Sequence, residues 1–482
     1  MVGNMSFKLY INGQLVEGKG VERTIYNPGT GEAAAVIRCA DKEQTLEALD
    51  GAREAFKTWS RMSLTDRGQW ITKLKQALYA QKEELVDILS METGKPLFAA
   101  ARGFNVLVDA LDYYYEEAKR FHGTTIPDYN SCNASYHINA YRPKGVMVGH
   151  LSWNMPLLNI GAKLGPTLAS GCTCVLKPAS LTPLSAMKVG EIAESIHFPK
   201  GVFNIVTGPV NEVAAVLNSS PVPRLITLIG SSETGKQVIR DSCNTIKSYS
   251  LELGGNAPAI VMPDADLEKT AGFIAGLKMN NCGQICTCVN RVLVHEDVAD
   301  EFAALVKKQF EACRLGWGRE EDITMGPLIT RGDRDRVLGL IADAVAHGAN
   351  LVCGGEIPKD KTSGNYMTPA LLTGCNNQME ICRKEIFGPA LPVITFKTLE
   401  EAVEIANDTE YGLSAYAYTQ NLHQAFLLTE KLEAGEIIVN VWGGGSPLPY
   451  AHGGVKESGV GKDWSVLSLA EYYDVKRITI TP

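Results

Sequence analysis

Gly283-Gln284-Ile285-Cys286 is the most informative stretch of this chain, and the run Leu251-Glu252-Leu253-Gly254-Gly255 precedes it. Cys286 is a candidate nucleophile, because a thiolate adds readily to an electrophilic carbonyl. The glycine in the stretch lets substrate and backbone approach closely without a Cβ in the way. Glu252 is a candidate base, since a buried carboxylate can activate water against the thioester that follows. The pair predicts acyl chemistry on an aldehyde.

Each residue also has a structural interpretation. Free cysteines are more often small buried hydrophobes than nucleophiles, and Cys282 and Cys288 flank Cys286 as competitors. A glutamate such as Glu252 at the end of a strand can simply accept backbone hydrogen bonds. The functional assignment therefore depends on the rest of the chain.

From Gly145 onward, short apolar segments alternate with helical ones, which is typical of a parallel sheet covered by helices on both faces. A second α/β series begins near Asn256. A dinucleotide usually binds at the carboxyl ends of such strands, yet no Gly-x-Gly-x-x-Gly follows any of them, so the residues alone leave the cofactor open. Strands are expected at 146–149, 173–176, 203–206, 225–228 and 248–251, and helices precede them at 43–60, 65–92 and 97–119.

The chain resembles the NAD(P)-dependent aldehyde dehydrogenase superfamily along essentially its whole length. The resemblance rests on motifs in the family's order: Trp153–Pro156, Lys177–Ser180, Gly230-Ser231 with Gly235, Glu252 in its Leu-Gly-Gly setting, Cys286, and Glu385–Pro389. It implies an α/β fold with a modified Rossmann cofactor domain, an α/β catalytic domain and a small β oligomerisation arm. The expected domains are 1–122 with 143–253 for the cofactor, 254–448 for catalysis, and 123–142 with 466–482 for the arm.

The resemblance also implies roles for the catalytic group, which comprises Cys286, Glu252, Asn154 and Lys177. Asn154 and the backbone N–H of Cys286 would stabilise the hemithioacetal oxyanion; without the family, Asn154 would be better interpreted as a helix cap. Glu252 would activate the deacylating water. Relatives that pass the acyl group to coenzyme A lack this glutamate, so its presence favours hydrolysis to a free acid.

The expected cofactor is NADP or NAD. Lys177 would bond the adenosine ribose, Ser231 the pyrophosphate, and Glu385 the nicotinamide ribose. Members that prefer NAD commonly carry Glu where this chain has Ser180, and the serine removes the repulsion of a 2′-phosphate. The full set of expected cofactor contacts is Ser152, Trp153, Lys177, Ala179, Ser180, Gly230, Ser231, Glu385 and Phe387.

The expected substrate contacts are Ala162, Asn280, Ser446 and His452. The segment Lys177–Pro183 is similar to that of succinate-semialdehyde dehydrogenases, but Ala162 and Asn280 stand where those enzymes have arginines for the distal carboxylate. His452 replaces the usual Phe, and the glycine-rich run 442–446 is a candidate rim. We therefore expect a short polar aldehyde, such as lactaldehyde or another hydroxy- or acid-bearing semialdehyde.

Composition limits the partners. A net charge of -8 without a basic block argues against nucleic-acid or membrane partners. The cysteine spacing does not match a zinc site, and no secretory signal is visible, so no metal and a cytoplasmic location are expected. The extended tail and the hairpin 123–142 resemble the family's oligomerisation arm, which implies a homodimer or homotetramer. The rival functions are a coenzyme A-acylating aldehyde dehydrogenase and an inactive dinucleotide-binding scaffold.

Overall fold

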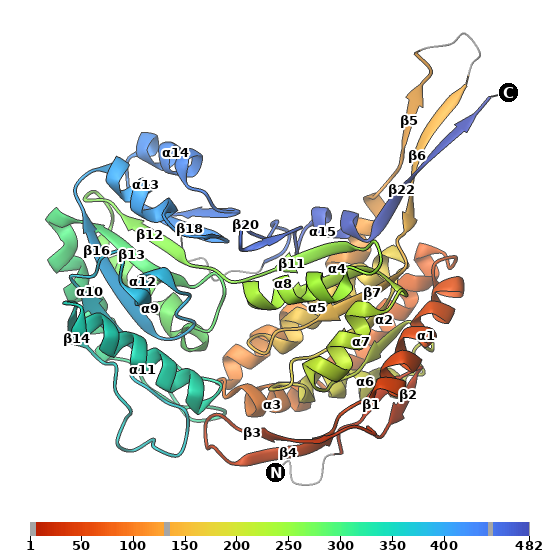
Figure 1. The fold of residues 1–482 in the computed structure, drawn as a ribbon, viewed down its shortest axis with the longest axis horizontal. Coiled ribbons are helices and arrows are strands. Elements are labelled where there is room, and N and C mark those ends of the chain that lie inside the picture. The colour runs from red at the N-terminus through yellow and green to blue at the C-terminus, as the bar shows by residue number, and fades with distance from the viewer. Residues whose placement is uncertain (1–5, 130–134, 442–446, 482) are drawn as a thin grey trace.

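The computed structural model describes residues 6–129, 135–441 and 447–481, and these residues form two α/β lobes and a projecting arm (Figure 1). The first lobe is built on an eight-stranded sheet whose central strands are parallel. In spatial order its strands are β2 (Gln14–Val16), β1 (Leu9–Ile11), β9 (Phe203–Ile205), β8 (Thr173–Lys177), β7 (Val146–His150), β10 (Pro223–Ile229), β11 (Ser248–Glu252) and β21 (Gly459–Val460).

Helices cover both faces of this sheet. Successive strands are parallel, so the chain must cross over between them, and helices form most of the crossovers. The helices are α1 (Lys42–Trp59), α2 (Leu64–Ala80), α3 (Lys82–Thr93), α4 (Leu97–Arg120), α5 (Pro156–Ser170), α6 (Leu184–Ser195), α7 (Ala215–Ser219) and α8 (Ser232–Ser242), and the hairpin β3 (Glu22–Tyr26) and β4 (Ala33–Arg38) lies beside them.

The second lobe has a seven-stranded sheet that is parallel except for β14 at its edge. Its strands are β14 (Asn350–Cys353), β15 (Ala370–Thr373), β16 (Ala390–Phe396), β13 (Val289–His295), β12 (Ala257–Val261), β18 (Ser414–Tyr418) and β19 (Glu436–Val439). Its main helices are α9 (Leu267–Met279), α10 (Ala299–Glu311), α11 (Arg331–Ala346), α13 (Leu399–Asn407) and α14 (Leu422–Lys431), with the short α12 (Glu380–Arg383).

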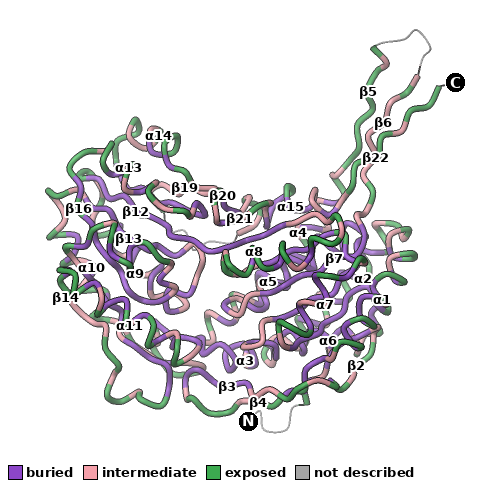
Figure 2. The backbone as a smooth tube through the Cα atoms, in the orientation of Figure 1, coloured by how far each residue is buried: buried purple, intermediate pink, exposed green. Residues whose placement is uncertain are grey.

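Three antiparallel strands form the arm: β5 (Thr124–Pro127), β6 (Tyr136–Pro143) and β22 (Tyr473–Ile480). The C-terminal strand pairs with β6 along its full length, from Tyr473 opposite Pro143 to Ile480 opposite Tyr136. Figure 2 shows that the arm is mostly exposed or half-buried, whereas the central strands of both lobes are buried. The short helix α15 (Val466–Glu471) leads into the arm.

The expected parallel strands all form, and several extend by a residue or two beyond the predicted ends. The prediction of one helix over 65–92 is wrong. Gln81 has φ -116° and ψ 24°, which ends α2 and starts α3 in a new direction. Leu78 and Leu85 lie on either side of this break and are buried in the same hydrophobic core. The apolar spacing therefore continues across the break, and the sequence pattern does not reveal that the helix ends there. After the break at Gln81, α3 packs against α4 and α6.

The topology gathers the carboxyl ends of β7, β8, β10 and β11 at one edge of the first sheet, where the loops that follow these strands meet. The short strand β21 returns from the C-terminal region and pairs Gly459 with Glu252. Leu253 then leads out of β11, and β12 begins the second sheet only a few residues later. The residues that join the two sheets therefore lie directly beside this edge.

Candidate active site

Cys286 lies in the loop between the turn 280–283 and β13, and local strain shapes this loop. Asn281, Cys282 and Gly283 all have positive φ, at 49°, 58° and 71°. A Cβ on Gly283 would lie 2.3 Å from the carbonyl oxygen of Gly388, so only glycine fits. Gln284 braces the loop, because its Nε2 donates to the Asn281 carbonyl at 2.8 Å and its Oε1 accepts from Ile329 N–H at 2.8 Å.

The three neighbouring thiols differ in exposure. Cys282 is 0% exposed and Cys288 is 6% exposed, and each belongs to an apolar core, whereas Cys286 is only half-buried. Burial raises the pKa of all three thiols. At Cys286 alone, the His452 imidazole opposes that rise. Cys286 is therefore the accessible thiol of the three, whereas Lys278 favours the thiolates of the two buried ones, Cys282 and Cys288.

Glu252 is the last residue of β11, and its charge raises the pKa of the Cys286 thiol. The residue is 3% exposed, and neither carboxylate oxygen accepts an aligned hydrogen bond within the described part of the chain. His452 Nε2 nevertheless lies 2.7 Å from Glu252 Oε2. Burial raises the pKa of Glu252, and His452 opposes this. Glu252 Oε2 thus lies beside an imidazole, while Oε1 has no partner among the described residues, and a buried carboxylate of this kind suits a base for water.

Asn154 lies between β7 and α5 and contacts the cysteine loop directly. Its Nδ2 donates to the carbonyl of Gln284 at 3.0 Å, and Lys95 Nζ donates to the Asn154 carbonyl at 2.5 Å. An amide nitrogen carries two N–H groups, so one donor is left after the Gln284 bond. The Asn154 Oδ1 is buried and has no partner among the described residues. The arrangement holds an amide donor close to Cys286.

Residues expected to contact the cofactor lie along the edge formed by β7, β8 and β10. Lys177 ends β8 and is buried, and its ammonium makes no ion pair or hydrogen bond within the described residues. Burial lowers its pKa to about 8. Ser231 caps α8, where its side chain accepts from Thr234 N–H. An unpartnered buried cation and a helix N-terminus on one edge fit the hydroxyl and phosphate groups of a dinucleotide.

Four further predicted residues lie along the same edge. Ser180 Oγ donates to the carbonyl of Gly208 at 3.4 Å, and Ala179 beside it is half-buried. The Ser152 carbonyl accepts from Asn159 Nδ2 at 3.1 Å. Gly230 N–H donates to the Glu252 carbonyl at 2.9 Å, which ties the start of α8 to the end of β11.

Glu385 and Phe387 come to this edge from the second lobe. Glu385 Oε1 accepts from Gly255 N–H at 3.0 Å, and a Cβ on Gly254 would lie 2.9 Å from Glu385 Oε2. Burial raises the pKa of Glu385 to about 7. Phe387 has a positive φ of 46°, and its ring packs edge-on against Trp153 at a centroid distance of 5.3 Å. The Trp153 and Glu385 motifs, distant in sequence, therefore meet.

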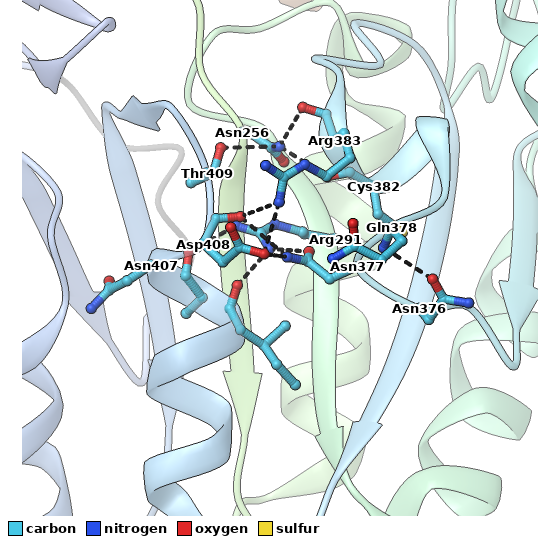
Figure 3. Close-up of polar contacts among 12 residues, drawn as sticks. Asn256, Arg291, Asn376, Asn377, Gln378, Cys382, Arg383, Asn407, Asp408 and Thr409 are labelled. Atoms are coloured by element: carbon cyan, nitrogen blue, oxygen red, sulfur yellow. Dashed lines mark hydrogen bonds and ion pairs between the residues drawn. The ribbon is translucent and has the colours of Figure 1, made fainter.

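A buried polar network supports this meeting point (Figure 3). Asn256, which follows Gly255, donates to the carbonyls of Cys382 and Arg383 at 2.9 and 3.1 Å. Arg291 on β13 is fully buried and donates to the carbonyls of Ile405 and Ala406, each at 2.7 Å. Breaking such a network leaves buried polar groups without partners, so it fixes the segment before Glu385 relative to the strand after Cys286.

The four expected substrate contacts occupy different environments. Ala162 is fully buried in an apolar cluster between α4 and α5 that includes Trp464. Asn280 is half-buried at the end of α9. Ser446, and with it the glycine-rich rim 442–446, lies outside the described residues. His452 lies between Glu252 and Cys286.

Two features of the site are contacts that the local sequence does not show. Glu436 at the start of β19 binds His452 Nδ1 through Oε1 and accepts from Ser414 Oγ at 2.9 Å. Lys163 is fully buried and pairs with Asp463 Oδ2 at 2.5 Å. The local sequence shows only that Glu436 is a carboxylate at the start of a short apolar strand. Nothing in it predicts a contact with His452. Within the described residues, no group of three or more His, Cys, Asp or Glu is arranged to hold a metal ion, and no helix is long and apolar enough to cross a membrane.

Known proteins align with this chain over nearly its full length. The profile of the "Aldehyde dehydrogenase family" matches residues 15–478. The mitochondrial succinate-semialdehyde dehydrogenase of rice is 36% identical over 462 residues, which is 96% of this chain and 86% of that protein. The NADP(+)-dependent succinate-semialdehyde dehydrogenase of Escherichia coli is 35% identical over 471 residues, which is 98% of this chain and 97% of that protein.

Solved structures agree over the whole fold. Lactaldehyde dehydrogenase from Escherichia coli superposes with a TM-score of 0.95 at 33% identity, covering 99% of each chain. Betaine aldehyde dehydrogenase from Staphylococcus aureus in complex with NAD+ also has a TM-score of 0.95, at 30% identity, covering 100% of this chain and 96% of that one. Both expected cofactors thus occur among the relatives, NAD+ here and NADP(+) in the Escherichia coli enzyme above. The predicted fold and enzyme class are confirmed, and this chain belongs to the aldehyde dehydrogenase family.

Proposed function

We propose that the protein oxidises a small polar aldehyde to its carboxylic acid, with NADP or NAD as the hydride acceptor. The observation that carries this proposal is the pairing of a half-buried thiol, Cys286, with a buried carboxylate, Glu252, whose oxygens accept no aligned hydrogen bond within the described residues. The similarity to semialdehyde and lactaldehyde dehydrogenases supports the same class of substrate.

The residues divide the reaction into two stages. The Cys286 thiolate adds to the aldehyde carbonyl, and the second amide N–H of Asn154 stabilises the resulting oxyanion, an interaction worth about 3 kcal/mol. Loss of hydride from the thiohemiacetal leaves a thioester on Cys286. Glu252 then takes a proton from water, and the hydroxide attacks the thioester to release the acid. A glutamate in this position supports hydrolysis over transfer to coenzyme A.

Bound NAD(P) supplies the hydride acceptor. In this proposal Lys177 and Ser180 hold its adenosine ribose, Gly230 and Ser231 its pyrophosphate, and Glu385 its nicotinamide ribose. Ser152, Trp153, Ala179 and Phe387 complete the contacts. The segments 1–122 and 143–253 form the cofactor domain, 254–448 the catalytic domain, and 123–142 with 466–482 the arm of a homodimer or homotetramer.

A cytoplasmic location is part of the proposal, and mitochondria are the alternative that the name of the rice relative suggests. The arm supports the oligomeric part, because its outer strands β22 and β5 each pair with β6 on one side and leave the other edge unpaired within the described residues.

Replacement of the nucleophile tests the core of the proposal. Cys286→Ala should lower kcat at least about a thousandfold, because no other described thiol beside the site is accessible. Cys288→Ala is the matched control and should keep most of the activity. The measurement is production of reduced cofactor with the purified full chain, alongside NAD(P) binding by fluorescence quenching. Substantial turnover by Cys286→Ala would refute the assignment.

The second prediction concerns cofactor choice. Ser180 carries no charge, so we expect NADP to be used at least as well as NAD. Ser180→Glu should lower kcat/KM for NADP at least about tenfold relative to NAD, because a carboxylate at this half-buried position repels the 2′-phosphate. Ser180→Ala adds no charge and should leave the ratio unchanged. Strict NAD dependence of the wild type would show that another group excludes the 2′-phosphate.

The third prediction concerns the substrate tail. Lys163 pairs with Asp463, and Ala162 and Asn280 provide no cation, so of these described residues only His452, which Glu252 and Glu436 already bind, is left to pair with a desolvated carboxylate on the substrate. We expect kcat/KM for lactaldehyde to exceed that for succinate semialdehyde. Butanal matches the chain length of succinate semialdehyde without its carboxylate and isolates the effect of charge. If succinate semialdehyde proves the best substrate of the panel, the account of the pocket is wrong.

A further inference from the structure

His452 lies between two largely buried carboxylates, and one of them is the proposed base. Its Nε2 is 2.7 Å from Glu252 Oε2, and its Nδ1 binds Glu436 Oε1. The side chains of His452, Glu252 and Glu436 are 17%, 4% and 20% exposed, respectively. Each ring nitrogen therefore faces a carboxylate oxygen in a place that is largely closed to water.

The charged form of the ring fits both contacts. A neutral imidazole carries one N–H, so its other nitrogen would turn a lone pair toward a carboxylate oxygen. The imidazolium carries two N–H groups, and its positive charge offsets part of the charge of two buried carboxylates, which are costly without a cation. The contact with Glu252 is close without being aligned as a hydrogen bond, so attraction between the charges holds this pair.

Two backbone hydrogen bonds and a serine hold this arrangement. The His452 N–H donates to the Asp463 carbonyl at 3.1 Å, and Asp463 N–H donates back to the His452 carbonyl at 2.7 Å. Glu436 Oε2 accepts from Ser414 Oγ at 2.9 Å, and Ser414 lies on the adjacent strand β18. The histidine and Glu436 are each fixed by a contact outside the pair, so the ring has a set position against Glu252.

The two oxygens of Glu252 have different surroundings. Oε2 faces the His452 ring, whereas Oε1 accepts no aligned hydrogen bond from the described residues. A Cβ on Gly453, which has φ 149°, would lie 2.9 Å from Oε1, so glycine at this position leaves that oxygen room beside the segment that carries His452. A base needs a lone pair for the proton of water, and Oε1 provides it.

We propose that His452 is the positioning residue of the base: its imidazolium, held by Glu436, keeps Glu252 ionised and leaves Oε1 for the water that attacks the thioester. This inference rests on the proposed hydrolytic role of Glu252. In that step an O–H bond of water breaks and its proton goes to Glu252 Oε1, while its electron pair forms the new C–O bond. The C–S bond then breaks, and the Cys286 sulfur leaves with its electron pair. His452 keeps both ring protons throughout.

The surrounding charges favour an ionised Glu252 beside a charged ring. Burial raises the pKa of Glu252, and of the charged groups around it the His452 imidazolium opposes this rise most. Burial also disfavours the charged ring, but Glu252, Cys286 and Glu436 outweigh it and raise the pKa of His452 well above its ordinary value. The other charged groups that act on this cluster are Lys163 and Asp463, which pair with each other, Lys462, which donates to the Gly453 carbonyl, and Glu471 and Glu385.

The pH dependence of deacylation tests this role. The full-length enzyme is acetylated on Cys286 with p-nitrophenyl acetate and freed of reagent, which separates hydrolysis of the thioester from ionisation of the thiol. Intact-protein mass spectrometry then follows loss of the acetyl group at a series of pH values. Glu252 acts as a base only when ionised, so the rate should rise with pH through the pKa of Glu252 and then level off.

His452→Gln removes the positive charge and keeps an amide donor beside Glu252. Without the cation the carboxylate ionises less readily, so the midpoint should move at least about one unit to higher pH, and the rate well below the midpoint should fall about tenfold. Well above the midpoint the rate should approach that of the wild type. The control His423→Gln changes an exposed histidine on α14 and should leave the profile unchanged.

The outcomes separate this role from the proposed function. Deacetylation of Glu252→Gln at the wild-type rate would refute the base itself. An unchanged midpoint in His452→Gln, or a loss of rate that is equal at every pH, would refute His452 alone, because a merely structural change slows the reaction without moving its midpoint. If His452→Gln fails to fold because Glu436 is left without a cation, the double substitution of His452→Gln with Glu436→Gln removes that charge too and decides: a shifted midpoint there supports the proposal, and an unchanged one overturns it.

Discussion

The approach of the Gly254–Gly255 backbone to the cysteine loop is the constraint on which the rest of the site depends. A Cβ on Gly255 would lie 2.3 Å from the Cys286 carbonyl oxygen, so no side chain fits between the two segments. The Gly255 N–H in turn holds Glu385 Oε1 at 3.0 Å. Since Glu252 ends the strand just before these glycines, one tight backbone contact sets the positions of base, nucleophile and Glu385 together.

The electrostatics follow from the same geometry. Glu252 and Lys177 are nearly fully buried and Glu385 is half-buried, and burial shifts the pKa of each toward its neutral form. A buried carboxylate or ammonium without a matched partner is costly for the fold. Perturbed groups of this kind gather at sites of chemistry, where they meet substrate, cofactor or water. Lys163 differs, because Asp463 satisfies its charge inside the protein.

The sequence predicted what periodicity and linear motifs encode. The alternating strands and helices are present, and the short motifs that contain Asn154 and Cys286 meet through the Asn154–Gln284 hydrogen bond. The break at Gln81 was missed because apolar spacing continues through it. Glu436 was missed for a different reason. It contacts His452 only because β19 pairs beside β18, and the local sequence does not predict the order of strands in a sheet.

The central claim is that Cys286 carries an acyl group that Glu252 helps to hydrolyse. Glu252→Gln, mixed with NAD(P) and aldehyde, should release about one equivalent of reduced cofactor in a burst and then turn over slowly. Intact-protein mass spectrometry should find the acyl group retained on Cys286, and added coenzyme A should yield no acyl-coenzyme A with the wild type. Steady turnover of Glu252→Gln at the wild-type rate, with no adduct on Cys286, would contradict the account.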